Sequence, residues 1–345
     1  MVFTILLSVL GSLLFLFILI FFAAAIGYRK IFDRRYDGSR YLKYFTEEDF
    51  PGLRAEPIAF PSDRGQILRG FLYSRVDDPC GLLIFVHGFG AGHRAYTTEI
   101  DYLAKCGFLV LAYDGTGCAL SDGIFRGFDQ GPVDLAAALR FAASDVRLRG
   151  FERIALVGHS WGAFSVMNAL EADERVAGCV AMSGFVSSAG AMGQQGSPHF
   201  YPLALLLRLC FWILNRLRFK EQANKNSIRS LTGTKKRALL LFGKEDGVIP
   251  YRYNGARIAR AVKGMDNIEC VCCEGKRHNV YLSGRAEAYM NGEFASLNAL
   301  AKKCEERAQE ILAPVDYALL TEEDAAIMEK IKNFCASVLG DEKSV

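Results

Sequence analysis

The run GHSWG, residues 158–162, decides the fold of this chain, because it has the form G-x-S-x-G and stands between two contrasting segments. The preceding residues, IALV at 154–157, are apolar in the manner of a buried parallel strand, and residues 163–172 have the composition of a helix. A strand, a sharp turn and a helix would expose the hydroxyl of Ser160, with glycines that let strand and helix pass closely. We therefore interpret Ser160 as a nucleophile rather than as part of a chance glycine-serine loop.

A serine nucleophile needs a base within hydrogen-bond reach and an acid that orients the base. His278 lies on a loop after a late apolar run, where such a base is expected, and Asp246 follows the apolar run before it. The order Ser160, Asp246, His278 is a known chain order for this triad. Glu245 is the competing acid, and we rank it below Asp246.

The loop HGFGAG at residues 87–92 follows a third apolar run and is rich in glycine. It has the character of a loop that offers backbone N–H groups to a developing oxyanion. We expect these donors to be the N–H groups of Phe89 and Trp161. The loop fits neither G-x-G-x-x-G nor a P-loop, which argues against a nucleotide site.

These motifs together resemble the serine hydrolase branch of the α/β-hydrolase superfamily, in particular its monoacylglycerol-lipase-like and serine-aminopeptidase-like group. Residues 113–121, YDGTGCALS, match the pattern of that group at Asp114, Gly117 and Ser121, and they depart from it at Thr116 and Ala119. The resemblance implies an α/β-hydrolase fold that carries a helical cap insert. It implies no metal and no organic cofactor.

The order of apolar runs and helical segments divides the chain into four parts. We expect a transmembrane anchor at 1–27, a juxtamembrane linker at 28–57, a hydrolase core at 58–185 and 236–345, and a helical cap insert at 186–235. Strands that alternate with helices predict a mostly parallel sheet with helices on both faces.

The cap insert contains an intensely apolar stretch at residues 202–217, with cations at its end. It is too short for a confident membrane span. A helix over it could be buried against the core, or it could line an acyl pocket or dip into a membrane interface. The two interpretations can hold together, one on each face of the helix.

Residues 1–27 carry no charged side chain and are long enough to span a bilayer as a helix. A cleaved signal peptide is the rival interpretation, with Ala23 to Ala25 as its cleavage site, but the start lacks Lys and Arg and the apolar stretch is long. Cationic residues directly follow this stretch, beginning with Arg29 and Lys30, so we expect the hydrolase domain to face the cytoplasm. The cysteines are scattered and lack the spacing of metal ligands, which fits the reducing environment of the cytoplasm.

The sequence thus predicts a membrane-anchored serine hydrolase that cleaves carboxylic esters, with an apolar acyl group, through an acyl-enzyme on Ser160. A serine peptidase or a thioesterase could use the same triad, and a non-catalytic membrane-tethered interaction module is a further alternative. The net charge of +3 gives no nucleic-acid signature. The expected partners are a small-molecule ester or lipid substrate and a membrane, and no protein partner can be named.

Overall fold

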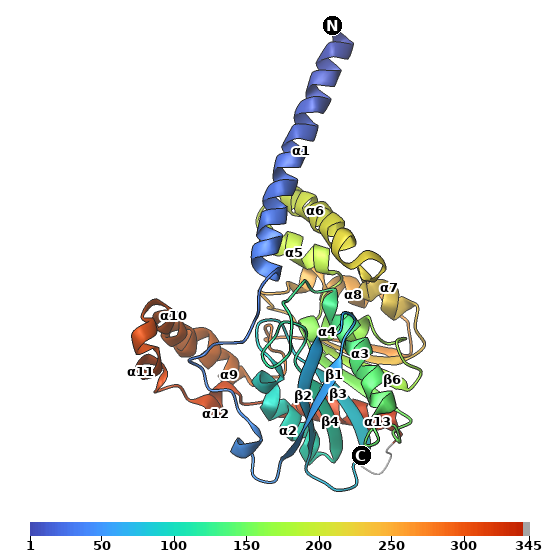
Figure 1. The fold of residues 1–345 in the computed structure, drawn as a ribbon, viewed down its shortest axis with the longest axis vertical. Helices are drawn as coiled ribbons and strands as arrows, with labels where there is room; N and C mark the ends of the chain where they lie inside the picture. Colours follow the sequence, from blue (N-terminus) through green and yellow to red (C-terminus); the bar gives the residue numbers. More distant parts are fainter. Residues whose placement is uncertain (341–345) are drawn as a thin grey trace.

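The computed structural model describes residues 1–340, and an eight-stranded sheet in the order β1-β2-β4-β3-β5-β6-β7-β8 forms its centre (Figure 1). β2 pairs antiparallel with both β1 and β4, whereas every pairing from β4 to β8 is parallel. This confirms the expected mostly parallel sheet. The strands are β1 Arg54–Pro61, β2 Ile67–Ser74, β3 Gly81–Val86, β4 Phe108–Tyr113, β5 Ile154–His159, β6 Val176–Met182, β7 Arg237–Gly243 and β8 Ile268–Cys273.

Helices cover both faces of the sheet, and the side-chain alternation of the strands divides the core between them. Along β3, Leu82 and Ile84 face one layer of helices, whereas Leu83 and Phe85 face the other. The first layer contains α3 Gln130–Ser144, α4 Trp161–Met167 and α8 Gly255–Ala261, and the second contains α2 Thr97–Lys105 and α13 Ala325–Leu339. Because both faces are covered, β3 and β5 are buried along their whole length, which explains their continuous apolar sequences.

The segment between β6 and β7 is helical and lies over the carboxyl edge of the sheet, beside the end of α1 (Figure 1). Its helices are α5 Ser188–Gly196, α6 Tyr201–Phe219 and α7 Ser227–Thr232. α6 contains the whole apolar stretch noted in the sequence. Short 3-10 turns complete the fold: η1 Glu47–Asp49, η2 His93–Tyr96, η3 Lys220–Gln222, η4 Tyr251–Tyr253 and η6 Glu305–Arg307.

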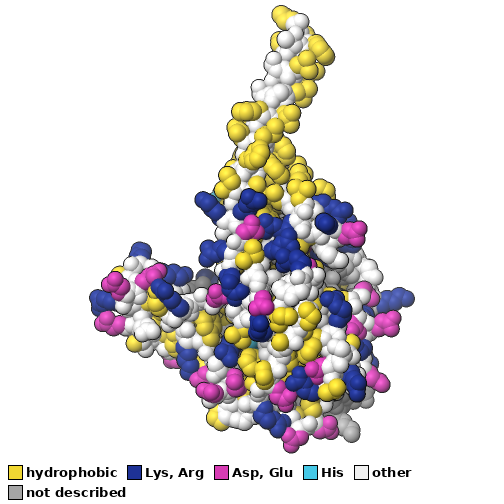
Figure 2. All heavy atoms as spheres, viewed as in Figure 1, with side chains coloured by type: hydrophobic (Ala, Val, Ile, Leu, Met, Phe, Trp, Pro, Cys, Tyr) yellow, Lys and Arg dark blue, Asp and Glu magenta, His cyan; other side chains and the backbone are white. Residues whose placement is uncertain are grey.

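α1, Val2–Phe32, is one long helix whose amino-terminal part projects from the rest of the molecule (Figure 1). It is the one helix within residues 1–340 that is long and apolar enough to cross a membrane, although a signal sequence has the same properties. The helix continues past the expected boundary at residue 27, because Ala24, Tyr28 and Phe32 form one buried stripe at a spacing of four residues. Figure 2 shows Lys and Arg side chains gathered where α1 meets the rest of the molecule.

A helical arm lies to one side of the sheet, built by residues that precede α13 (Figure 1). It has its own small apolar core, to which Tyr41 and Leu42 of the segment after α1 contribute. That segment is shorter than the expected linker, since β1 begins at Arg54, paired with Ser74 of β2. The arm consists of α9 Gly284–Tyr289, a π-helical turn Met290–Phe294, α10 Ala295–Lys303, α11 Ala308–Leu312 and α12 Tyr317–Leu320.

Candidate active site

Ser160 occupies a strained turn between β5 and α4, with φ 55° and ψ −111°. Such a conformation is rare for a residue with a side chain and persists only where the surroundings impose it. A Cβ atom on Gly158 would lie 2.5 Å from the backbone of Gly162, and one on Gly162 would lie 1.9 Å from the carbonyl oxygen of Val86. Both glycines are therefore needed for α4 to cross so close to the ends of β5 and β3, which forces the turn at Ser160.

The structure brings together Ser160, His278 and Asp246, as the sequence predicts. The imidazole Nε2 of His278 lies 3.0 Å from Ser160 Oγ, and its Nδ1 lies 2.8 Å from Asp246 Oδ2. The three residues follow β5, β8 and β7, so they meet at the carboxyl edge of the sheet, where open α/β sheets place their sites. Glu245, the competing acid, is exposed and its carboxylate has no such contact within residues 1–340.

The carboxylate of Asp246 is held by the backbone so that one oxygen faces the histidine. Its Oδ1 accepts the N–H groups of Val248 and Ile249, each at 2.8 Å. Oδ2 is thereby left for Nδ1–H of His278. With Nδ1 protonated, the neutral imidazole presents a lone pair at Nε2 to the hydroxyl of Ser160, the tautomer that a general base requires.

The expected oxyanion donors, Phe89 and Trp161, have backbone N–H groups that bond to no other group within residues 1–340. The loop before Phe89 is fixed by His87, whose Nδ1 donates to the carbonyl of Gly88 at 2.7 Å and whose Nε2 accepts N–H of Gly115 at 2.9 Å. Burial lowers the pKa of His87, so its imidazole stays neutral and keeps this pattern. Two free N–H donors therefore remain near the serine.

A buried hydrogen-bond chain links the loop of Phe89 to the loop of His278, through a residue that the sequence did not reveal. The hydroxyl of Tyr96 accepts N–H of Gly88 at 3.1 Å and donates to Nδ1 of His159 at 2.9 Å. Nε2–H of His159 then donates to the carbonyl of His278 at 3.0 Å. Burial lowers the pKa of His159 to about 3, so this imidazole is neutral and has one donor and one acceptor.

A cavity of about 470 Å³ opens beside Ser160 and His278, a volume within the usual range of ligand pockets. Its walls come from parts of the chain that are distant in sequence, among them the end of α1, the loops after β3, β4 and β7, the start of α4 and the helical insert. The lining is overwhelmingly apolar, and its larger side chains are Ile31, Phe32, Phe89, Phe128, Trp161, Phe185, Met192, Phe211, Val248 and Ile249.

Part of the chain matches the model of a known protein family. Residues 77–238, just under half of the chain, match the family model described as serine aminopeptidase, S33, a range that includes Ser160. With its mostly parallel sheet and this match, the chain has the α/β-hydrolase fold. No curated protein sequence matches it.

Three esterases of known structure have the same fold as this chain. An esterase of Pyrococcus furiosus has a TM-score of 0.56 at 18% identity, covering 81% of this chain and 98% of its own. The esterase Est1E of Butyrivibrio proteoclasticus, seen with bound ferulic acid, has a TM-score of 0.52 at 16% identity, covering 82% and 99%. An acetyl xylan esterase of Paenibacillus sp. R4 has a TM-score of 0.53 at 16% identity, covering 73% and 87%. The chain thus shares the α/β-hydrolase fold with these three esterases.

The motif residue Asp114 has a structural role in this chain. It is buried, and its carboxylate accepts the backbone N–H of His93, N–H of Leu120 and the imidazole Nδ1–H of His93. Burial alone would raise the pKa of Asp114, but the contacts with His93 outweigh it and lower the pKa to about 2. Asp114 therefore holds the start of η2, and with it the position of Tyr96.

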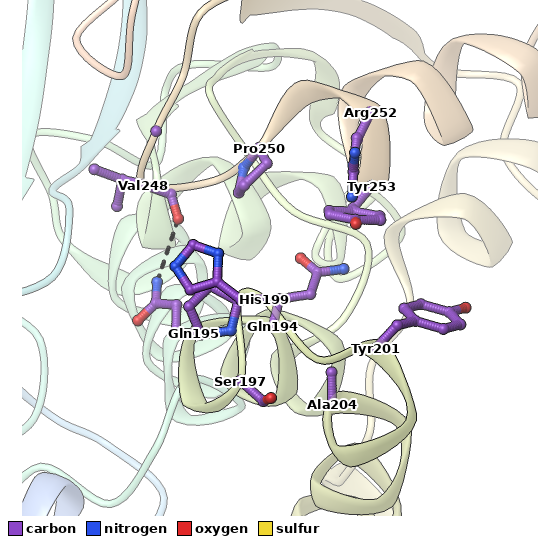
Figure 3. A pocket seen from close by; sticks show the side chains of 12 residues that line it. Gln194, Gln195, Ser197, His199, Tyr201, Ala204, Val248, Pro250, Arg252 and Tyr253 are labelled. Carbon is purple, nitrogen blue, oxygen red and sulfur yellow. Dashed lines mark hydrogen bonds between the residues drawn. The ribbon is translucent and has the colours of Figure 1, made fainter.

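A second, more polar pocket of about 170 Å³ adjoins the apolar cavity (Figure 3). The two share Gln195 and Val248, and Nε2 of Gln195 donates to the carbonyl of Val248 at 3.4 Å. His199, to which the sequence gave no role, lines this pocket together with Arg252 and Tyr253. One side-chain amide thus separates an apolar compartment from a polar one. Within residues 1–340, no three His, Cys, Asp or Glu side chains are grouped so as to hold a metal ion.

Proposed function

We propose that this hydrolase is a membrane-anchored serine esterase with Ser160 as nucleophile, His278 as base and Asp246 as the acid that orients it. The observation that carries the proposal is the continuous chain of hydrogen bonds from Asp246 Oδ2 through His278 to Ser160 Oγ, which ends at an apolar cavity. The esterase folds of the structural neighbours support the same reaction class.

In this mechanism Ser160 Oγ attacks the carbonyl carbon of the ester as Nε2 of His278 accepts its proton. Asp246 keeps Nδ1–H in place and stabilises the imidazolium that forms. The N–H groups of Phe89 and Trp161 receive the oxyanion. His278 then gives the proton to the departing alkoxide, which leaves an acyl group on Ser160. Water, deprotonated by His278, attacks the acyl carbon, the bond to Ser160 Oγ breaks, and the carboxylic acid leaves as His278 returns the proton to Ser160 Oγ.

The substrate that fits the cavity best is a carboxylic ester with an apolar acyl group. Binding an alkyl chain against this apolar lining removes the chain from water, which is favourable by about 0.8 kcal/mol for each buried CH₂ group. The family match also raises aminopeptidase activity as a second candidate. An aminopeptidase must bind a free ammonium group, yet the lining contains no Asp or Glu. This difference favours an ester over a peptide amino terminus.

The anchor in this proposal is α1, retained in the mature protein, with the catalytic domain on the cytoplasmic side. The exposed apolar surface of α1 is suited to lipid rather than to water. Arg29 and Lys30 occupy its last turn, and Arg34 and Arg35 follow it, so the cations flank one end of the apolar segment.

The decisive experiment labels the full chain, in detergent, with a fluorophosphonate that reacts with activated serines. Ser160→Ala should abolish labelling. Ser183→Ala is the matched control, because Ser183 is also buried, also has a positive φ (54°) and also follows a strand of the sheet. Retained labelling of Ser160→Ala would contradict the proposal. In the same assay Asp246→Asn should slow labelling strongly and Glu245→Gln should leave it unchanged.

A panel of p-nitrophenyl esters and amino-acid p-nitroanilides separates the two candidate activities. We expect turnover of the esters and none of the anilides. Preferential turnover of the anilides would favour the peptidase.

A further inference from the structure

The carboxyl-terminal turns of α1 are built into the domain rather than attached to its surface. Ala24, Tyr28 and Phe32 are buried, and they share one apolar cluster with Phe125 and Trp161. The ring centroid of Phe32 lies 5.5 Å from that of Phe125. Full burial of a phenylalanine side chain stabilises the folded state by removing its apolar surface from water. The end of the helix is therefore part of the folded core.

A buried chain of hydrogen bonds fixes this end of α1 against the helical insert. The hydroxyl of Tyr28 donates to Asn215 Oδ1 on α6 at 2.6 Å, and Nδ2 of Asn215 donates to Ser188 Oγ on α5 at 2.8 Å. The hydroxyl of Ser188 in turn donates to Asp129 Oδ2 at 3.0 Å. Buried polar groups that lose such partners destabilise the fold, so this series of hydrogen bonds favours a single position of α1.

An ion pair and a cation–π contact hold the same turns from the outer side. Nη1 of Arg218, on α6, lies 2.7 Å from Oδ1 of Asp33, and the Arg218 side chain is 15% exposed. The guanidinium also lies 4.7 Å from the centroid of the Tyr28 ring. α6 thus holds the end of α1 in place through two of its side chains, Arg218 and Asn215.

Because of this fixed position, α1 supplies part of the wall of the cavity beside Ser160. Ile31 and Phe32 both line that cavity. Ile31 is nonetheless 43% exposed, so it stands where the cavity reaches the surface. On the same helix, one turn or more toward the amino terminus, Phe22 and Ile26 are exposed and apolar. The mouth therefore lies beside the segment that would enter the lipid.

We propose that the last turns of α1 form a wall of the acyl site, so that the anchor itself sets which acyl chains are accepted. The substrate is then an ester that resides in the membrane, and its acyl chain enters beside Ile31. This inference rests on the proposed esterase function. It adds that Ile31 is a specificity-determining residue, whereas Ile26, of the same type and on the same helix, is not.

The test compares Ile31→Trp with Ile26→Trp in the full-length protein in detergent, using p-nitrophenyl acetate and p-nitrophenyl laurate. Ile31→Trp adds bulk at the mouth, so kcat/KM for laurate should fall by about tenfold or more, the discrimination that small changes in an apolar pocket produce. The acetate needs no acyl pocket, so its kcat/KM should stay within about twofold. Ile26→Trp should leave the laurate-to-acetate ratio unchanged. Equal ratios in the two variants would overturn the inference.

A second variant covers the case in which Ile31→Trp loses both activities. Ile31→Ala removes bulk from an exposed position and should raise the laurate-to-acetate ratio, and an unchanged ratio would overturn the inference. Failure of the proposed function gives a different result, because the wild-type protein would then hydrolyse neither ester. A wild type that cleaves both, with Ile31 variants that match Ile26→Trp, contradicts only the role of α1.

Discussion

Tyr96→Phe removes one oxygen atom and, with it, the link between the loop of Phe89 and the loop of His278. The hydroxyl of Tyr96 accepts N–H of Gly88 and donates to Nδ1 of His159, and all of these groups are buried. The substitution preserves the ring and its packing, so its effect isolates the two hydrogen bonds. Tyr96 does not touch Ser160 in any hydrogen bond and is in our interpretation a positioning residue.

The magnitude follows from the partners that lose their bonds. Each buried donor or acceptor left unpaired costs about 1–3 kcal/mol, so the loss for the N–H of Gly88 and Nδ1 of His159 together should be about 2–6 kcal/mol. Each kcal/mol changes the Tm of a domain of 150–250 residues by about 2–4 °C, and the lower slope applies to this larger domain, so we expect an apparent Tm about 4–12 °C lower. Displacement of the loop that carries Phe89 should also reduce kcat by about tenfold, with KM for p-nitrophenyl acetate nearly unchanged.

Tyr113→Phe is the matched control for this prediction. Tyr113 is equally buried, but its hydroxyl has no hydrogen-bond partner within residues 1–340. Its removal should leave Tm equal or slightly higher and kcat unchanged. Thermal unfolding of the three proteins in one detergent, together with ester kinetics, measures both effects. If the two Phe variants have the same Tm and the same kcat, the relay through Tyr96 has no role.

Two further predictions concern pH and topology. Burial raises the pKa of Asp129 to about 6, so this carboxyl binds its proton more tightly in the folded state than in the unfolded state. The protonated carboxyl therefore contributes its full stabilisation below about pH 4, and this stabilisation is lost as the pH rises through about 6. The Tm of the wild type minus that of Asp129→Asn should therefore decrease from about pH 4 to about pH 7, and an increase would refute the assignment. Cys304 is exposed at the end of α10. A membrane-impermeant maleimide should label it only after cells are permeabilised, with Cys304→Ser as the control, and labelling of intact cells would place the domain outside.

The candidate triad could be predicted from the sequence because each residue directly follows an apolar run. In a parallel sheet the ends of such runs meet at one edge, so residues far apart in the chain become neighbours by topology alone. The turn at Ser160 adds a local signal, because a Cβ on Gly158 would meet the backbone of Gly162, only four residues away. These parts of the site need no knowledge of side-chain packing.

Other features depend on packing between distant segments and could not be predicted. Tyr96 acts through Gly88 and His159, and nothing in its own neighbourhood in the sequence points to either. β1 begins at Arg54, before the expected start of the core at residue 58, and it contains Pro57, which is tolerated because the strand is at the edge of the sheet. The cap of α13 is Asp324, whose Oδ1 accepts the N–H groups of Ala326 and Ile327.

The contacts between α6 and α1 also determine the order in which parts of the newly synthesised chain can pack. Tyr28 is separated by 187 residues from Asn215, the group that receives its hydroxyl bond. At about 5–20 residues per second, a ribosome needs about 10–40 s to add that length. Throughout this interval Tyr28 lacks the surface of α6 that covers it in the finished fold. A chaperone or a lipid bilayer must shield the helix first, and the substrate cavity closes only after the insert has been synthesised.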